Sequence, residues 1–224
     1  MIALDLRGHG DSQWGPPDGY SPPNYLGDIG AFLKALSIEK ASFIWSSMGG
    51  AMAMIFATLA PNIVDRLALN DIGAEIVIEA PDPAQPALTD RRFHTIADAT
   101  RFYRESLHPV GLLPELVAEN LTADSVKIGE DGLLVWKTDP AVSSGAATGS
   151  AGAGRLIQMW SFYQNVKAPV LIVRRAESTA LTRETVSKML SVLPGTRAAE
   201  VPGVGHTPWL NEAVALQALR DFLT

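Results

Sequence analysis

The chain has 224 residues, which is enough for one large domain or for one domain with an insertion. Its 24 acidic and 18 basic residues give a formal charge of −6 without a basic cluster, which argues against a nucleic-acid binder. The absence of cysteine excludes disulfides, thiolate metal sites and a cysteine nucleophile. No apolar run approaches the roughly 20 residues of a membrane span, and no signal peptide is recognisable, so we expect a cytoplasmic protein without a membrane partner.

The first part of the chain alternates between strand-like and helix-like segments. An apolar run at 2–6 predicts a strand, and the polar, glycine-rich residues after it predict a turn. Apolar spacing then predicts a helix over 24–36, a strand at 41–45, a helix over 48–60 and a strand at 66–70. This alternation favours a parallel sheet with helices on both faces.

Residues 75–165 interrupt the alternation. Helical patterns cover 96–107, 113–121 and 155–165, and a short strand pattern covers 132–137. Residues 143–154 consist almost wholly of Gly, Ala, Ser and Thr, which is typical of a flexible linker. The alternation then resumes with a strand at 169–174, a helix over 182–193, a strand at 197–201 and a closing helix over 209–223.

The stretch Trp-Ser-Ser-Met-Gly-Gly at 45–50 joins a predicted strand to a predicted helix, which is the context that a nucleophile elbow requires. In such a turn Ser47 presents its Oγ above the sheet. The amide of Met48 then lies at a helix N-terminus, where it stabilises developing negative charge. The stretch departs from the pattern G-x-S-x-G at Trp45. The alternative interpretation is an ordinary serine N-cap at a strand–helix turn.

Five segments resemble the α/β-hydrolase-fold enzymes, in the order that this family requires. The motif Asp-x-Arg-Gly-x-Gly-x-Ser at 5–12 is similar to the segment after the family's fourth strand, and 47–50 resembles the elbow. Residues 66–73 resemble the strand after the elbow, 169–174 the strand before the triad acid, and Pro-Gly-Val-Gly-His-Thr-Pro at 202–208 the histidine loop.

The resemblance covers most of the chain outside 75–165. It implies an α/β fold with a mostly parallel sheet, a core made of 1–74 and 166–224, and a mainly helical cap or lid at 75–165. It also implies that Ser47 is the nucleophile and His206 its base. His9 is expected to be structural, and no two histidines have the spacing of metal ligands, so we expect neither a metal nor a cofactor.

The acid of the triad departs from the family pattern, because Thr179 stands where family members have an aspartate. Asp71, after the strand that follows the elbow, could replace it, and so could Glu177, two residues from the expected position. A site without an acid is the third alternative. We place Asp71 first. Loss of the carboxylate costs about 10⁴ in turnover in a well-studied triad.

The resemblance further implies a chain that is shortened at its N-terminus, without the family's first three strands and the oxyanion loop after the third. The Met48 amide would then be the remaining oxyanion donor, and loss of one such donor costs about 10²–10³ in turnover. The elbow strand would pair with residues 2–6 or with a second copy of the chain. We therefore expect a sheet of about five parallel strands and a tendency to form a homodimer through an exposed sheet edge.

The sequence thus predicts a serine hydrolase, foremost a carboxylesterase, that forms an acyl-enzyme with a small-molecule ester or related acyl substrate. The alternative is a catalytically silent hydrolase-fold protein, either a ligand-binding module or a truncated descendant. Trp45, Thr179 and the missing strands favour this alternative. The joint presence of Ser47, the glycines after it and His206 favours the enzyme.

Overall fold

A computed structural model of the chain describes residues 1–78, 91–106, 115–143, 155–204 and 208–224. The chain divides into two compact units. One contains residues 1–32, 81–108 and 112–152, and the other contains residues 33–80, 109–111 and 153–224. The assignment of 75–165 to a cap stays a prediction, and so does the linker, because 144–154 lie outside the described residues.

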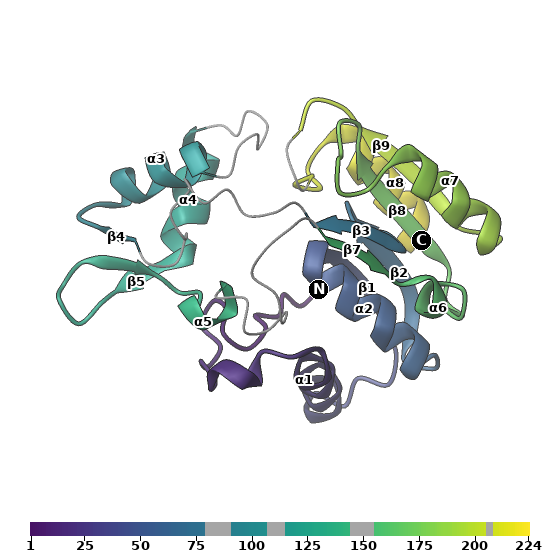
Figure 1. The fold of residues 1–224 in the computed structure, drawn as a ribbon, viewed down its shortest axis with the longest axis horizontal. Coiled ribbons are helices and arrows are strands. Elements are labelled where there is room, and N and C mark those ends of the chain that lie inside the picture. Colours follow the sequence, from purple (N-terminus) through teal and green to yellow (C-terminus); the bar gives the residue numbers. More distant parts are fainter. Residues whose placement is uncertain (79–90, 107–114, 144–154, 205–207) are drawn as a thin grey trace. The chain divides into compact units, whose positions relative to one another are not determined.

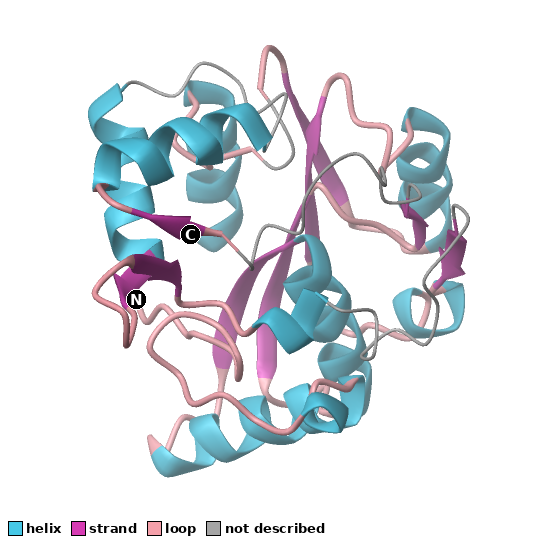
Figure 2. Ribbon diagram, turned by 60° about the vertical axis from the view of Figure 1, so that its left-hand side comes forward, coloured by secondary structure: helices cyan, strands magenta, loops and turns pink. Residues whose placement is uncertain are grey.

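The second unit is built on a four-stranded parallel sheet with the strand order β1-β2-β8-β9 (Figure 1). Its strands are β1 (Ala41–Ser46), β2 (Val64–Asn70), β8 (Val170–Arg175) and β9 (Arg197–Val201). All six residues of β8 are buried, as expected for a strand that is covered on both faces. The helices of this unit are α2 (Ser47–Leu59), α6 (Trp160–Tyr163), α7 (Arg183–Val192) and α8 (Ala213–Leu223). Figure 2 distinguishes the helices and the strands of the chain by colour.

Helices α2 and α8 cover opposite faces of this sheet. Phe43 of β1 stacks on Phe56 of α2, with 5.7 Å between the ring centroids, and Phe43 is in register with Leu67 of β2. The next residue, Ala68, faces the other way because side chains alternate along a strand. Ala68 belongs to a buried cluster with Leu219 of α8. The predicted parallel sheet with helices on both faces is confirmed.

The first unit contains a small antiparallel sheet with the order β4-β6-β5 and a core of its own. Phe93 and Trp136 meet edge to face at the centre of this core, with ring centroids 5.4 Å apart. Phe102 and Tyr103 of α3 pack against the same indole. The elements are η1 (Pro17–Gly19), α1 (Pro22–Ala35, which continues into the second unit), β4 (Arg92–Phe93), α3 (Ile96–Ser106), α4 (Glu115–Ser125), β5 (Val126–Ile128), β6 (Leu134–Trp136) and α5 (Pro140–Ser143).

Three predictions about strands and helices are wrong. Residues 2–6 form no strand, and the sheet of the described residues has four parallel strands rather than about five. The segment closes on itself instead, because the Asp5 carboxylate accepts the amide of Asp11 and the Asp5 carbonyl accepts the hydroxyl of Ser12. The helix expected over 155–165 is replaced by β7 (Arg155–Gln158) and α6, because β7 pairs antiparallel with β3 (Glu75–Ile78).

Helix α1 ends in a Schellman motif that has serine where glycine is usual. The amide of Ile38 donates to the carbonyl of Leu33 at 2.9 Å, and the amide of Ser37 donates to the carbonyl of Lys34 at 3.0 Å. This motif holds Ser37 at φ 55°, a left-handed conformation that costs a non-glycine residue about 1–2 kcal/mol.

We expect Ser37→Gly to raise the free energy of unfolding by about 0.5–1 kcal/mol, because the relieved strain exceeds the extra chain entropy of glycine. Urea denaturation of the two proteins measures the difference. The matched control is Ser191→Gly inside α7, which should lower stability by about 0.5 kcal/mol. A midpoint for Ser37→Gly at or below that of the wild type would contradict the argument.

Candidate active site

Ser47 lies at the junction of β1 and α2, in a backbone conformation that serine rarely adopts. Its φ is 48°, whereas the preceding Ser46 is extended, with φ −108° and ψ 146°. A strained serine between a strand and a helix has the geometry of a nucleophile elbow. The predicted strand–turn–helix context is confirmed, and the catalytic role of Ser47 stays a prediction.

The two glycines after Met48 allow α2 to approach the sheet closely. A Cβ atom at Gly50 would lie 2.4 Å from Cγ2 of Ile72, and one at Gly49 would lie 3.0 Å from Cε3 of Trp45. The indole of Trp45 also stacks on Phe43, with 5.8 Å between the ring centroids. The tryptophan that replaces the first glycine of the pattern therefore packs over the first turn of α2, and Gly49 provides the space for it.

The amide of Met48 has the position expected of an oxyanion donor. Met48 is the second residue of α2, and the first four amides of a helix have no partner within the helix. The first turn of α2 contains no acidic side chain to neutralise the positive end of the helix dipole. This end of α2 can therefore stabilise negative charge next to Ser47.

Asp71 follows the last residue of β2, directly beside β1 in the sheet. Its side chain is fully buried, and its Oδ1 accepts the backbone amide of Arg175 at 3.1 Å. Its Oδ2 lies 3.8 Å from Nε of Arg175, so the two side chains form a buried ion pair. Parallel strands end at the same edge of a sheet, and Asp71 therefore lies at the edge where β1 leads into Ser47.

The segment after β8, where the family has its acid, is held by a buried arginine. Arg174 donates to the carbonyl of Leu181 at 2.7 Å and to that of Ala176 at 2.8 Å. Glu177 and Thr179 are both exposed in this segment. The structure therefore gives Asp71 a fixed, buried environment and leaves the alternative acid Glu177 in contact with solvent. The sequence did not point to Arg174, because its partners here are backbone carbonyls, which every residue type has.

Arg174 also shares Glu200 of β9 with Arg183. Nη1 of Arg174 lies 2.7 Å from Oε2 of Glu200, and Nη2 of Arg183 lies 2.6 Å from Oε1. Hydrogen bonding by Arg183, together with the attraction of both guanidinium groups, lowers the pKa of Glu200 from 4.5 to about 2. A folded-state pKa below the unfolded one means that ionised Glu200 stabilises the fold above pH 4.5, and this contribution is lost as the pH falls towards 2.

We therefore expect Glu200→Gln to lower the urea midpoint at about pH 7, with the difference from the wild type shrinking between about pH 5 and pH 3. Urea titrations at several pH values measure the difference in midpoint and its dependence on pH. Glu130→Gln, at an exposed position between β5 and β6, is the control and should leave the midpoint unchanged at each pH. A difference for Glu200→Gln that stays constant or widens on acidification would disprove this linkage.

The proposed base lies in the short segment 205–207, outside the described residues, so the structure gives no distance from His206 to Ser47 or Asp71. His108 also lies outside the described residues. His94 is exposed, and Nδ1 of His9 lies 3.1 Å from the carbonyl of Arg7 within its own turn. This local contact agrees with a structural role for His9.

Asn70, the last residue of β2, is a candidate that sequence reasoning missed. Its buried side chain contacts both the elbow and the residues that follow 205–207. The available signal was a polar residue that directly follows the apolar run 67–69 and directly precedes Asp71.

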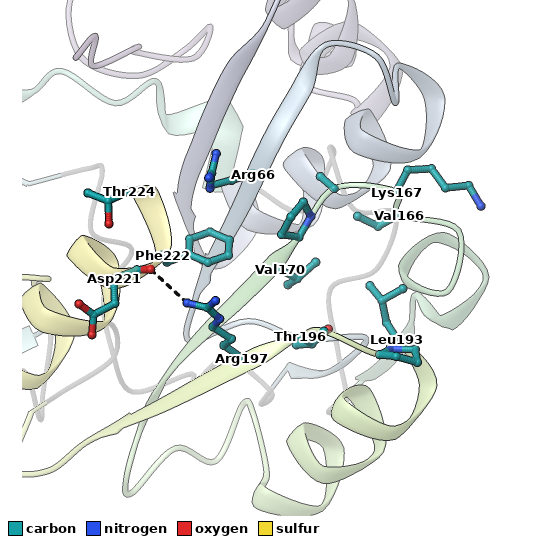
Figure 3. Close-up of a pocket in the computed structure, with 14 residues that line it drawn as sticks. Arg66, Val166, Lys167, Val170, Leu193, Thr196, Arg197, Asp221, Phe222 and Thr224 are labelled. Atoms are coloured by element: carbon teal, nitrogen blue, oxygen red, sulfur yellow. Dashed lines mark hydrogen bonds between the residues drawn. The ribbon is translucent and has the colours of Figure 1, made fainter.

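A cavity of about 540 Å³ lies at the amino ends of the parallel strands, away from the ends that lead into Ser47 and Asp71 (Figure 3). Its lining includes Arg66, near the start of β2, and Val170 and Arg197, the first residues of β8 and β9. Nη1 of Arg197 donates to the carbonyl of Asp221 at 3.1 Å across this cavity wall. Ser47 follows the other end of the parallel strands, so the cavity is not part of the candidate active site.

The described part of the chain contains no group of three or more His, Cys, Asp or Glu residues that could hold a metal ion. Among the same residues, no helix is both long and apolar enough to cross a membrane.

A parallel sheet whose first strand leads into a strained serine turn defines an α/β protein of the hydrolase type. The chain belongs to the alpha/beta hydrolase family, since a model of this family matches residues 1–218. This match confirms the resemblance and the fold class that the five sequence segments predicted.

Several relatives match along the whole chain. The 3-hydroxybutyrate-oligomer hydrolase of Cupriavidus necator is 29% identical over 231 aligned residues, which cover 100% of this chain and 79% of the relative. Esterase YbfF of Escherichia coli is 25% identical over 239 aligned residues, with 100% and 82% covered. The crystal structure of an alpha/beta hydrolase from Novosphingobium aromaticivorans superimposes with a TM-score of 0.81 at 27% identity, covering 98% of this chain and 78% of the other.

Proposed function

We propose that this protein is a serine hydrolase that cleaves carboxylic esters through an acyl-enzyme on Ser47. The conformation of Ser47 carries the proposal. An N-cap serine has an extended backbone, and Ser46 already occupies the N-cap position of α2 with that geometry. Ser47 instead has a left-handed φ of 48°, whose cost is expected at a functional turn and is unnecessary for capping.

In this mechanism Oγ of Ser47 attacks the ester carbonyl while His206 removes the hydroxyl proton. The amide of Met48 donates to the oxygen that becomes negative in the tetrahedral intermediate. The intermediate expels the alcohol, which takes the proton from His206, and leaves an acyl group on Ser47. Water then attacks the acyl-enzyme with His206 as base, and the acid product and free serine are released. No cofactor enters the reaction.

We assign the triad acid to Asp71. Its burial at the edge where Ser47 lies supports this assignment, because a carboxylate that orients an imidazole must itself be held in place. The hydrogen bond from the amide of Arg175 supplies that support. Glu177, by contrast, is exposed to solvent.

The names of two relatives support an ester as the substrate. One is a 3-hydroxybutyrate-oligomer hydrolase and the other an esterase. We therefore propose small carboxylic esters as the substrate class and include a linear dimer of 3-hydroxybutyrate among the test compounds.

The proposal is tested with a fluorophosphonate probe, which forms a covalent bond with activated serines. We expect the wild type to be labelled, peptide mapping to place the label on Ser47, and Ser47→Ala to remain unlabelled. Ser42→Ala, an exposed position on β1, is the matched control and should be labelled like the wild type. A wild type that is neither labelled nor active on p-nitrophenyl acetate, p-nitrophenyl butyrate or the dimer would overturn the proposal and favour a silent ligand-binding protein.

A further inference from the structure

Asn70 connects two segments that are far apart in the sequence. Only 2% of its surface is exposed, and its Nδ2 donates to Oγ of Ser46 and to the carbonyl of Pro208, each at 2.8 Å. Ser46 directly precedes Ser47, and Pro208 is the second residue after His206. One buried side chain therefore joins the segment of the proposed nucleophile to the segment of the proposed base.

The two acceptors fix the orientation of the Asn70 amide. The carbonyl of Pro208 can only accept a hydrogen bond, so Nδ2 must face it and Oδ1 must point elsewhere. Oδ1 is buried and has no hydrogen-bond partner within the described part of the chain. Asparagine therefore acts here as a double donor. An aspartate of the same shape would instead place an oxygen against the Pro208 carbonyl.

We propose that Asn70 is a positioning residue of this hydrolase, which holds Pro208 beside the elbow and thereby supports proton transfer from Ser47 to its proposed base, His206. The inference rests on the proposed roles of these two residues. A misplacement of about 1 Å in reacting groups can cost about 10² in rate. Because Asn70 acts on proton transfer and not on substrate binding, its loss should lower kcat and leave KM nearly unchanged.

The first test compares Asn70→Asp with Asn165→Asp. Nδ2 of Asn165 also donates to a carbonyl at 2.8 Å, that of Ser161, but Asn165 is exposed and precedes β8 at the opposite edge of the sheet. We expect Asn70→Asp to lower kcat for p-nitrophenyl butyrate about 10²-fold and to slow fluorophosphonate labelling, with KM changed by less than about threefold. Asn165→Asp should match the wild type.

Asn70→Ala is the second variant, because it removes both donors without bringing two oxygens together. It should lose kcat to a similar extent. A kcat within about twofold of the wild type for either variant, in protein shown to be folded by circular dichroism, would overturn the proposal.

The two hydrogen bonds can also be separated. Ser46→Ala removes one acceptor and leaves the bond to Pro208, so we expect a loss in kcat of less than about tenfold. Added to Asn70→Ala, it should have no further effect, because the shared bond is already absent. Full additivity of the two changes would show that they act independently. It would contradict the clamp, by which we mean the pair of hydrogen bonds from Asn70 to Ser46 and to Pro208.

Hydrogen–deuterium exchange of the peptide 202–210 tests the clamp by a measurement that does not depend on catalysis. Faster exchange of this peptide in Asn70→Asp, with exchange elsewhere unchanged, is expected. Unchanged exchange would overturn the clamp even if kcat falls. If the wild type is neither labelled by fluorophosphonate nor active on the test esters, the proposed function has failed, and a positioning role in catalysis fails with it. Exchange then reports only the hydrogen bonds that join the two segments.

Discussion

Replacing Ser47 with alanine should lower kcat for p-nitrophenyl butyrate by about 10⁶-fold, the loss measured when the serine of another triad is removed. The reason is chemical, because no other group in the proposed mechanism can form the acyl-enzyme. The residual rate should exceed that of water, since the amide of Met48 and substrate binding persist. Steady-state kinetics of Ser47→Ala beside Ser42→Ala measure the effect.

The same position allows an independent test of the strain argument. Ser47→Gly should be as inactive as Ser47→Ala, but it should be more stable than the wild type by about 1 kcal/mol, because glycine adopts the left-handed φ without a penalty. Urea denaturation measures the stability. Substantial activity in either variant, or a less stable Ser47→Gly, would contradict the functional interpretation of this turn.

Replacing Asp71 with asparagine should lower kcat by about 10⁴-fold, because the imidazole loses the group that fixes its tautomer and stabilises its charged form. Glu177→Gln should retain the wild-type kcat. The opposite result, an active Asp71→Asn and an inactive Glu177→Gln, would move the acid to Glu177. If both variants stay active, the site works without a carboxylate.

Stability has to be separated from activity in this experiment, because Asp71→Asn leaves Arg175 buried without its counter-charge. Breaking one side of such a pair costs about 3–5 kcal/mol, whereas replacing both sides by neutral groups is often close to neutral. The double variant Asp71→Asn, Arg175→Met should therefore recover most of the stability and none of the activity. Recovery of kcat together with stability would show that Asp71 serves the fold and not the reaction.

The core of the fold could be predicted because parallel strands covered on both faces are short apolar runs. β8 shows this most clearly, with every residue buried. The failures at 2–6 and 155–165 have a common cause. An apolar run becomes a strand only when a partner is available, and the partner of β7 is β3, far away in the sequence. Residues 2–6 find partners in their own turn instead.

The candidate site was predictable to the extent that its signals are local. Ser47 and its glycines are adjacent in the sequence, so the strand–turn–helix pattern was visible. The ion pair of Asp71 with Arg175 and the bridge from Asn70 to Pro208 each join residues more than a hundred positions apart. Spacing carries no information about such contacts, because they exist only after the strands have been placed side by side.

The contact between Trp45 and Gly49 restricts the order in which this turn can change during evolution. While the indole is present, a methyl group at position 49 would sit 3.0 Å from its Cε3 atom, so alanine at 49 requires the indole to shift. Loss of the indole first removes that conflict, although it leaves a void beside Phe43 that costs stability. A sequence with a small residue at 45 and a larger one at 49 is thus expected to arise by substitution at position 45 first. The residues at the two positions should therefore vary together among relatives of this chain.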